Sequence, residues 1–154
     1  MTTDDVTTDN SAAPGSGLAP GDWTRREMKG IPASLGALWT HRDENGWHYG
    51  VQLDQSHVNA QGFVHGGVLM TFMDHGLSLM VWEAVGRAMS STIQLDSHFL
   101  APVRPPAFVE LDGQILKQGR TLVFVRGVLR VAGKDVMQAT GVWSIAAKSG
   151  PSGA

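Results

Sequence analysis

The pattern of apolar and polar positions along the chain centres on one long apolar run. Residues 68–84 read VLMTFMDHGLSLMVWEA and are apolar on almost every side of a helix. A helix that is apolar all round leaves no face for water, so other elements must enclose it. Gly66 and Gly67 directly before the run suit a helix start, where backbone N–H groups lack partners and side chains would block close approach. We therefore expect a long buried helix that starts at these glycines.

Alternating apolar and polar positions on both sides of this run predict strands. The first two form a hairpin, because the connector between them ends in Asn45-Gly46, a pair that tolerates the positive φ of tight turns. The order is a strand pair, one helix and then a four-strand meander. It predicts an α+β fold in which a curved antiparallel sheet of about six strands wraps one central helix. The expected strands cover 36–42, 47–53, 91–100, 107–117, 121–131 and 134–147.

The two ends differ in composition from the rest. Residues 1–20 are small, polar and rich in Gly and Pro, and residues 148–154 resemble them, so both segments are expected to be disordered. Residues 21–147 then form a single domain, which is long enough to bury its own core. Between 23 and 35, apolar residues mixed with charges predict a short helix that leads into a break at Pro32.

Charge and composition narrow the function classes. Lys and Arg total 12 against 14 acids without a long basic run, which disfavours nucleic acid as a partner. The chain has no cysteine, and its six histidines show no zinc-helix spacing, so we expect no metal and no cofactor. No apolar run has membrane length without interruption, and the N-terminus does not resemble a secretory signal. These features favour a cytoplasmic enzyme or binding protein.

Asp74 is a single carboxylate in the middle of the apolar run. Burying its charge without a partner would be costly. One interpretation is a catalytic acid. The other is a structural acid bonded to a hydroxyl about one turn away, on Thr71 or Ser78. The residues alone leave both open.

A motif surrounds this acid: Asn59, Gly62, His65-Gly66-Gly67, Asp74, Thr92 and Pro102, with a turn at Gly119-Arg120. It resembles the motif of the hotdog-fold acyl-CoA thioesterases of the PaaI-like, phenylacetate-pathway type. The resemblance covers roughly 36–147. It implies a long helix wrapped in an antiparallel sheet, hydrolysis of thioesters, and dimers with shared sites that often pair into tetramers.

Under this resemblance four residues are expected to be catalytic. Asp74 would be the nucleophile or general base, and the Gly66 N–H at the helix start would hold the oxyanion. Asn59 would donate to the thioester carbonyl or orient a water, and Thr92 would hold the attacking water. The competing interpretations are a turn residue for Asn59 and an ordinary strand threonine for Thr92.

The acyl-CoA substrate needs an apolar pocket and a contact for phosphate. Phe63, Met70, Met73, Leu77 and Trp82 suit an aryl or medium-chain acyl group. Arg120, chosen from Arg104, Arg120 and Arg126, is the candidate for the CoA phosphates. His65 is expected to tie down the loop before the helix. The full set of expected substrate-binding residues is His65, Gly67, Phe63, Met70, Ser78 and Arg120.

The spacing of the motif adds a constraint on assembly. Gly66 and Asp74 are eight residues apart, or about 12 Å along a helix at ~1.5 Å per residue. One carbonyl cannot touch both residues of the same helix. If both are catalytic, the site lies between two chains, which predicts a homodimer; the resemblance extends this to a dimer of dimers.

Two other functions compete with thioester hydrolysis. A hotdog hydratase or dehydratase acting on acyl thioesters needs an acid–base pair, commonly His with Glu or Asp, and the His-Gly-Gly placement argues against it. A non-catalytic acyl-CoA-binding protein would use Asp74 only for structure.

Overall fold

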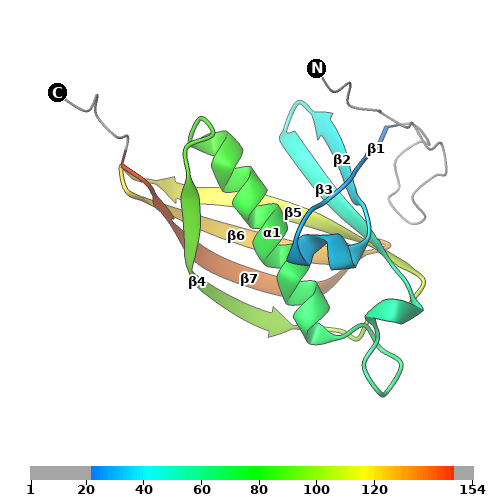
Figure 1. The fold of residues 1–154 in the computed structure, drawn as a ribbon. Coiled ribbons are helices and arrows are strands. Elements are labelled where there is room, and N and C mark those ends of the chain that lie inside the picture. The colour runs from blue at the N-terminus through cyan, green and yellow to red at the C-terminus, as the bar shows by residue number, and fades with distance from the viewer. Residues whose placement is uncertain (1–21, 148–154) are drawn as a thin grey trace.

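The computed structural model describes residues 22–147, so the predictions for 1–20 and 148–154 lie outside the described residues. One long helix lies against the concave face of a curved seven-stranded antiparallel sheet (Figure 1). The strands are β1 (Thr24–Arg26), β2 (Leu38–Asp43), β3 (Gly46–Leu53), β4 (Ser90–Phe99), β5 (Ala107–Gln118), β6 (Leu122–Val131) and β7 (Lys134–Ile145). The helix is α1 (Gly66–Ala84), and two short 3-10 helices are η1 (Ile31–Leu35) and η2 (Gln55–His57).

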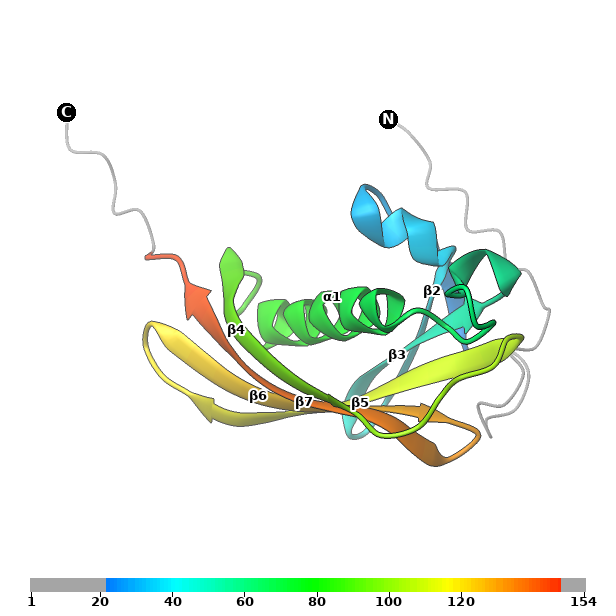
Figure 2. The same ribbon diagram turned by 90° about the horizontal axis from the view of Figure 1, so that it is seen from below.

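The strand order is β1-β2-β3-β5-β6-β7-β4. Strand β4, which directly follows α1 in the chain, lies at the far edge of the sheet beside β7, so β1 and β4 are the two edges (Figure 2). The α+β prediction and all six expected strands are confirmed, since each has a counterpart here. None of the helices in the described residues has the length and apolarity of a membrane span.

The segment before β2 differs from the prediction. Instead of a helix from residue 23, Thr24–Arg26 pairs with β2 as a seventh strand. The 3-10 helix then begins at Ile31 and carries Pro32 in its first turn. Proline lacks an N–H, but the first turn of a helix needs none there, so Pro32 starts this helix rather than breaking one.

Helix α1 has two different faces. A stripe of six residues at helical spacing is buried against the sheet: Leu69, Phe72, Met73, Gly76, Leu77 and Val81. The opposite face, including Thr71, His75 and Ser78, is only half-buried, and Trp82 is 37% exposed. One copy of the sheet therefore covers one side of a helix that the sequence makes apolar on nearly all sides.

Glycines in the sheet let α1 approach closely. Gly113 and Gly127 stand opposite each other on β5 and β6. A Cβ at Gly127 would lie 2.7 Å from the Sδ of Met73, and a Cβ at Gly113 would lie 2.8 Å from the Sδ of Met80. Both distances are shorter than a van der Waals contact, so the two methionines occupy the space that side chains at these glycines would need.

Gly141 on β7 plays a similar part for the edge strand. A Cβ there would lie 2.5 Å from Trp143 and 2.8 Å from the backbone oxygen of Gln94. Gln94 follows an irregularity in the β4–β7 pairing that separates it from Thr92. Gly141 therefore permits the path that β4 takes past the middle of α1.

This packing predicts that Gly141→Ala destabilises the protein. The added methyl group must displace a backbone carbonyl and a fully buried indole, so we expect the free energy of unfolding to fall by about 1–3 kcal/mol. Urea unfolding followed by circular dichroism measures the change. Gln138→Ala, at an exposed position of the same strand, is the control and should stay within about 0.5 kcal/mol of the parent. Equal stability of the two variants would contradict the packing argument.

Candidate active site

A short hydrogen bond joins the middle of α1 to the edge strand. The hydroxyl of Thr92 on β4 donates to Oδ1 of Asp74 at 2.6 Å. The two hydroxyls nearer in sequence are engaged elsewhere: Thr71 donates to the backbone oxygen of Gly67 at 2.8 Å, and Ser78 accepts from the indole N–H of Trp143 at 3.0 Å. Asp74 is half-buried, so its charge retains some solvent, and Oδ2 has no protein partner among residues 22–147.

The start of α1 has one backbone donor left over. His65 is the N-cap: its Nδ1 accepts from the Gly67 N–H at 2.8 Å, and its backbone oxygen accepts from Val68 and Leu69. Within the part of the chain that the structure describes, nothing accepts from the Gly66 N–H. Because Nδ1 is an acceptor, the neutral ring carries its proton on Nε2. His65 thus fixes the loop and leaves the Gly66 N–H, at the positive end of the helix, open to an anion.

Asn59 organises the loop that leads into α1. Its Oδ1 accepts from the backbone N–H groups of Gln61 at 3.0 Å and Phe63 at 3.2 Å. This is the turn role that competed with a catalytic one, and it leaves the side-chain NH2 as a free donor among the described residues. Asn59, Phe63, Gly66 and Phe99 line a pocket of about 350 Å³.

Two further contacts shape this pocket. A Cβ on Gly66 would lie 3.3 Å from the ring of Phe99, which is 53% exposed. The guanidinium of Arg104 lies 4.3 Å from the ring centroid of Phe63. Arg104 therefore stacks on Phe63, a residue that lines the same pocket as Gly66. The sequence offered both Arg104 and Arg120, and only the fold separates them.

Arg120 lies near the other end of the helix. It is exposed in the turn between β5 and β6, and Gln118 just before this turn donates to the backbone oxygen of Ala84 at 3.4 Å. Arg126 bonds to Oε1 of Gln114 at 2.6 Å. Arg120 therefore does not share a pocket with Gly66 of its own chain.

A second pocket lies along the C-terminal half of α1 and begins at His75 and Ser78, one residue and one helical turn beyond Asp74; we call it the pocket beside Asp74. It has a volume of about 630 Å³, and its lining includes His75, Ser78, Leu79, Trp82 and Met89. Partial burial lowers the pKa of His75, and the adjacent charge of Asp74 opposes this shift.

The expected acyl-pocket lining needs one correction. Met73 and Leu77 are fully buried between α1 and the sheet, so they cannot line a pocket on the open side. They belong to the buried stripe of α1, because residues four positions apart lie on the same face of a helix. Trp82 lies in the pocket beside Asp74, Phe63 lies in the pocket beside Gly66, and Met70 is half-buried against the core.

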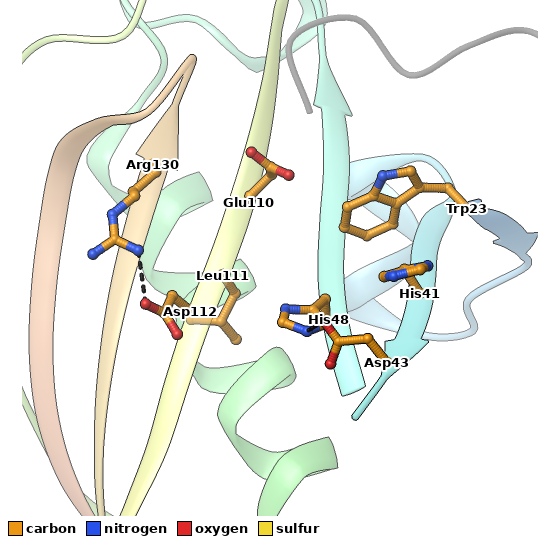
Figure 3. A pocket seen from close by; sticks show the side chains of 8 residues that line it. All are labelled: Trp23, His41, Asp43, His48, Glu110, Leu111, Asp112 and Arg130. Carbon is orange, nitrogen blue, oxygen red and sulfur yellow. Dashed lines mark hydrogen bonds and ion pairs between the residues drawn. The ribbon is translucent and has the colours of Figure 1, made fainter. Parts of the chain in front are cut away.

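A polar pocket of about 310 Å³ lies apart from these residues, on the side of the sheet away from α1 (Figure 3). Arg130 lies on one side, bound to Asp112 and Asp135 at 2.7 Å each, with Trp23, His41 and His48 across from it (Figure 3). Burial raises the pKa of Glu110 between them. Within residues 22–147, no group of three or more His, Cys, Asp or Glu side chains is arranged to hold a metal ion.

Comparison with known proteins assigns the family. Residues 61–137, half of the chain, match the family model described as the Thioesterase superfamily. The chain belongs to the thioesterase superfamily. Human acyl-coenzyme A thioesterase 13 is 24% identical over 74 residues, which make up 48% of this chain and 53% of that protein. The chain spans about half the length of the curated relatives it matches, between 53% and 56%.

Solved structures share the fold of this superfamily member. Zebrafish thioesterase superfamily member 2 aligns with a TM-score of 0.70 and 20% identity, over 78% of this chain and 89% of that one. A mutant of the phenylacetic acid degradation protein PaaI from Thermus thermophilus aligns with a TM-score of 0.65 and 21% identity, over 73% of this chain and 96% of that one. A hypothetical thioesterase from Streptococcus pneumoniae, solved with coenzyme A, aligns with a TM-score of 0.61 and 22% identity, over 66% of this chain and 79% of that one. The hotdog fold expected from the sequence is confirmed.

The cap on α1 generates a prediction about stability. His65→Ala removes the acceptor for the Gly67 N–H, and we expect the free energy of unfolding to fall by about 1 kcal/mol. His65→Asn supplies a side-chain oxygen that suits an N-cap and should keep most of the stability. Urea unfolding of both variants tests this. If Ala and Asn prove equally stable, His65 does not cap the helix.

Proposed function

We propose that the protein hydrolyses an acyl-CoA thioester to a free acid and CoA. The observation that carries the proposal is the Thr92–Asp74 hydrogen bond. It fixes a carboxylate one helical turn before Ser78, which lines a largely apolar pocket, in a thioesterase superfamily member. With Oδ1 held by Thr92, Oδ2 is left to take a proton from water. The oxygen of Thr92 keeps lone pairs that accept from the same water and hold it in place.

The proposed reaction has two steps, addition of water and loss of the thiolate. The water oxygen bonds to the thioester carbon as its proton moves to Asp74, and the carbonyl becomes an oxyanion. A free backbone N–H at a helix start, such as that of Gly66, stabilises this charge. Collapse of the intermediate breaks the C–S bond, and the CoA thiolate takes up the proton. Direct attack by Asp74 on the carbonyl would also require the ionised carboxylate.

Gly66 and Asp74 of one helix lie too far apart to act on the same carbonyl, so the proposed site combines two copies of the chain. The unpaired edge of β4 supports this arrangement, since a ten-residue edge strand offers its backbone to another strand. Three exposed apolar residues on or next to it add to this surface: Met89 at 76%, Ile93 at 59% and Phe99 at 53%. The half-buried outer face of α1 would be covered by the same contact.

The substrate follows from the pockets. The largely apolar pocket beside Asp74 suits an aryl or medium-chain acyl group. Arg120 and Arg104 are the candidate cations for the CoA phosphates, because arginine binds phosphate well; Arg104 stacks on Phe63 in the pocket wall near Gly66. The coenzyme A in the related Streptococcus pneumoniae structure supports a CoA ester. A hydratase is disfavoured because His65 is committed to the helix cap and does not pair with an acid.

The acid generates the main functional prediction. Asp74→Asn keeps the shape of the side chain but removes the charge, so turnover of the best acyl-CoA should fall by at least about a hundredfold. Free CoA released from a panel of acyl-CoA substrates measures it. Glu44→Gln, at an exposed position in the turn between β2 and β3 and away from β4, is the control and should keep full turnover. A folded Asp74→Asn protein with near-parental turnover would mean that Asp74 is structural.

The shared site generates a complementation test. Gly66→Val should block approach to the backbone N–H and lower turnover by about a hundredfold. If the Gly66→Val and Asp74→Asn chains are unfolded, mixed and refolded together, each mixed dimer contains one site with both functional residues. About a quarter of the parental activity should return, as random pairing with two-fold symmetry requires. Mixing that restores nothing would place each site within a single chain.

A further inference from the structure

The pocket beside Asp74 ends at Trp82, and a second pocket begins on the other side of this indole. The second pocket, of about 290 Å³, lies between the β2–β3 hairpin and the C-terminal half of α1. Its lining combines Leu38, Trp47 and Tyr49 with the charged residues Arg26 and Glu83. We call the two spaces the front chamber, beside Asp74, and the rear chamber, beside Tyr49. Leu79, Trp82 and Arg87 line both chambers and so separate them.

The indole of Trp82 is held in place by the chain that follows it. The guanidinium of Arg87 lies 5.0 Å from the centroid of the ring, in cation–π contact. Arg87 also pairs with Glu83 at 3.2 Å, and its backbone N–H donates to the Trp82 oxygen at 2.7 Å. Its φ of 66° is one that side chains other than glycine rarely adopt. The chain therefore bends back here and lays the arginine on the indole.

The rear chamber contains a polar group without a protein partner. Tyr49 is 5% exposed, yet its hydroxyl has no hydrogen-bond partner among the described residues. Burial and, to a lesser extent, the charge of Glu83 raise the pKa of Tyr49 to about 12, so the hydroxyl stays protonated. The hydroxyl is not one of the fully buried polar atoms that lack a partner, so it reaches the open space of the rear chamber. A ligand atom that accepts from it there gains a hydrogen bond.

We propose that Trp82 determines acyl-chain specificity by closing the front chamber, and that the rear chamber receives longer acyl groups once the indole is displaced. This inference rests on the proposed function, because the acyl group must enter beside Asp74. The parental protein then prefers acyl groups that end against Trp82. Tyr49 at the rear favours an acyl group with an oxygen at its far end, provided the chain passes the indole.

The test uses binding, so that it does not depend on catalysis. S-alkyl-CoA thioethers from butyl to tetradecyl, which cannot be hydrolysed as thioesters, are titrated by calorimetry into the full-length parent and Trp82→Ala. For the parent, affinity should rise with chain length and then level off or fall. For Trp82→Ala, the rise should continue for at least two or three further methylenes, each raising affinity about fourfold. Phe124→Ala is the matched control, since Phe124 is 38% exposed against 37% for Trp82 but lies outside both chambers.

A second arm locates the end of the chain. An alkyl-CoA thioether with a terminal hydroxyl should bind Trp82→Ala more tightly than the double variant Trp82→Ala with Tyr49→Phe, by about fivefold for one hydrogen bond. Arg87→Ala keeps the indole of Trp82 but removes the cation–π contact that holds it. This variant should give a chain-length profile between those of the parent and Trp82→Ala. This variant also tests the inference if Trp82→Ala fails to fold.

The outcomes separate the two proposals. An unchanged chain-length profile in folded Trp82→Ala, or in Arg87→Ala where the former is unfolded, overturns the role of Trp82 and leaves hydrolysis untouched. A shifted profile with no hydrolysis of any acyl-CoA supports the role of Trp82 and overturns the proposed activity. If no thioether binds the parent or either variant, the inference is overturned as well.

Discussion

The structure depends on one constraint, which is that a single sheet covers only one side of an apolar helix. Met73 and Met80 of helix α1 pack against Gly127 and Gly113 of the sheet. Because these glycines have no side chains, the helix lies close to the sheet. Its other side carries the acid, the hydroxyls and the indole, and is only half-buried. In the proposed dimer, a second copy with its own β4 edge covers this face.

The same constraint explains how the candidate site is divided. The start of α1 provides a backbone donor, because His65 satisfies the neighbouring N–H groups and leaves the one at Gly66. The middle of α1 provides the carboxylate, held by a threonine from the edge strand. In the proposed reaction these two groups act on opposite sides of one carbonyl, but the rise of a helix keeps them apart within one chain. Two antiparallel helices from two copies would bring the Gly66 N–H of one chain to the Asp74 carboxylate of the other, at two equivalent sites.

Much of this was predictable from the sequence because it rests on local signals. The apolar run located α1, alternation located six strands, and Asn45-Gly46 located the hairpin. The features that the sequence did not predict depend on tertiary contacts. The three residues of β1 become a strand only because β2 offers its edge. Met73 and Leu77 looked equivalent to Trp82 as pocket residues, since the sequence is apolar on all sides of the helix and does not indicate which face meets the sheet. Likewise, Arg104 stood out from the other arginines only when the fold brought it to Phe63.

The central claim is that the site is complete only when two copies meet. Specific activity on the best acyl-CoA, measured over a dilution series together with sedimentation velocity at the same concentrations, tests it most directly. Activity per chain should fall in proportion to the dimer fraction and return when the protein is concentrated again. Constant activity per chain in a sample that sediments as a monomer would contradict the account.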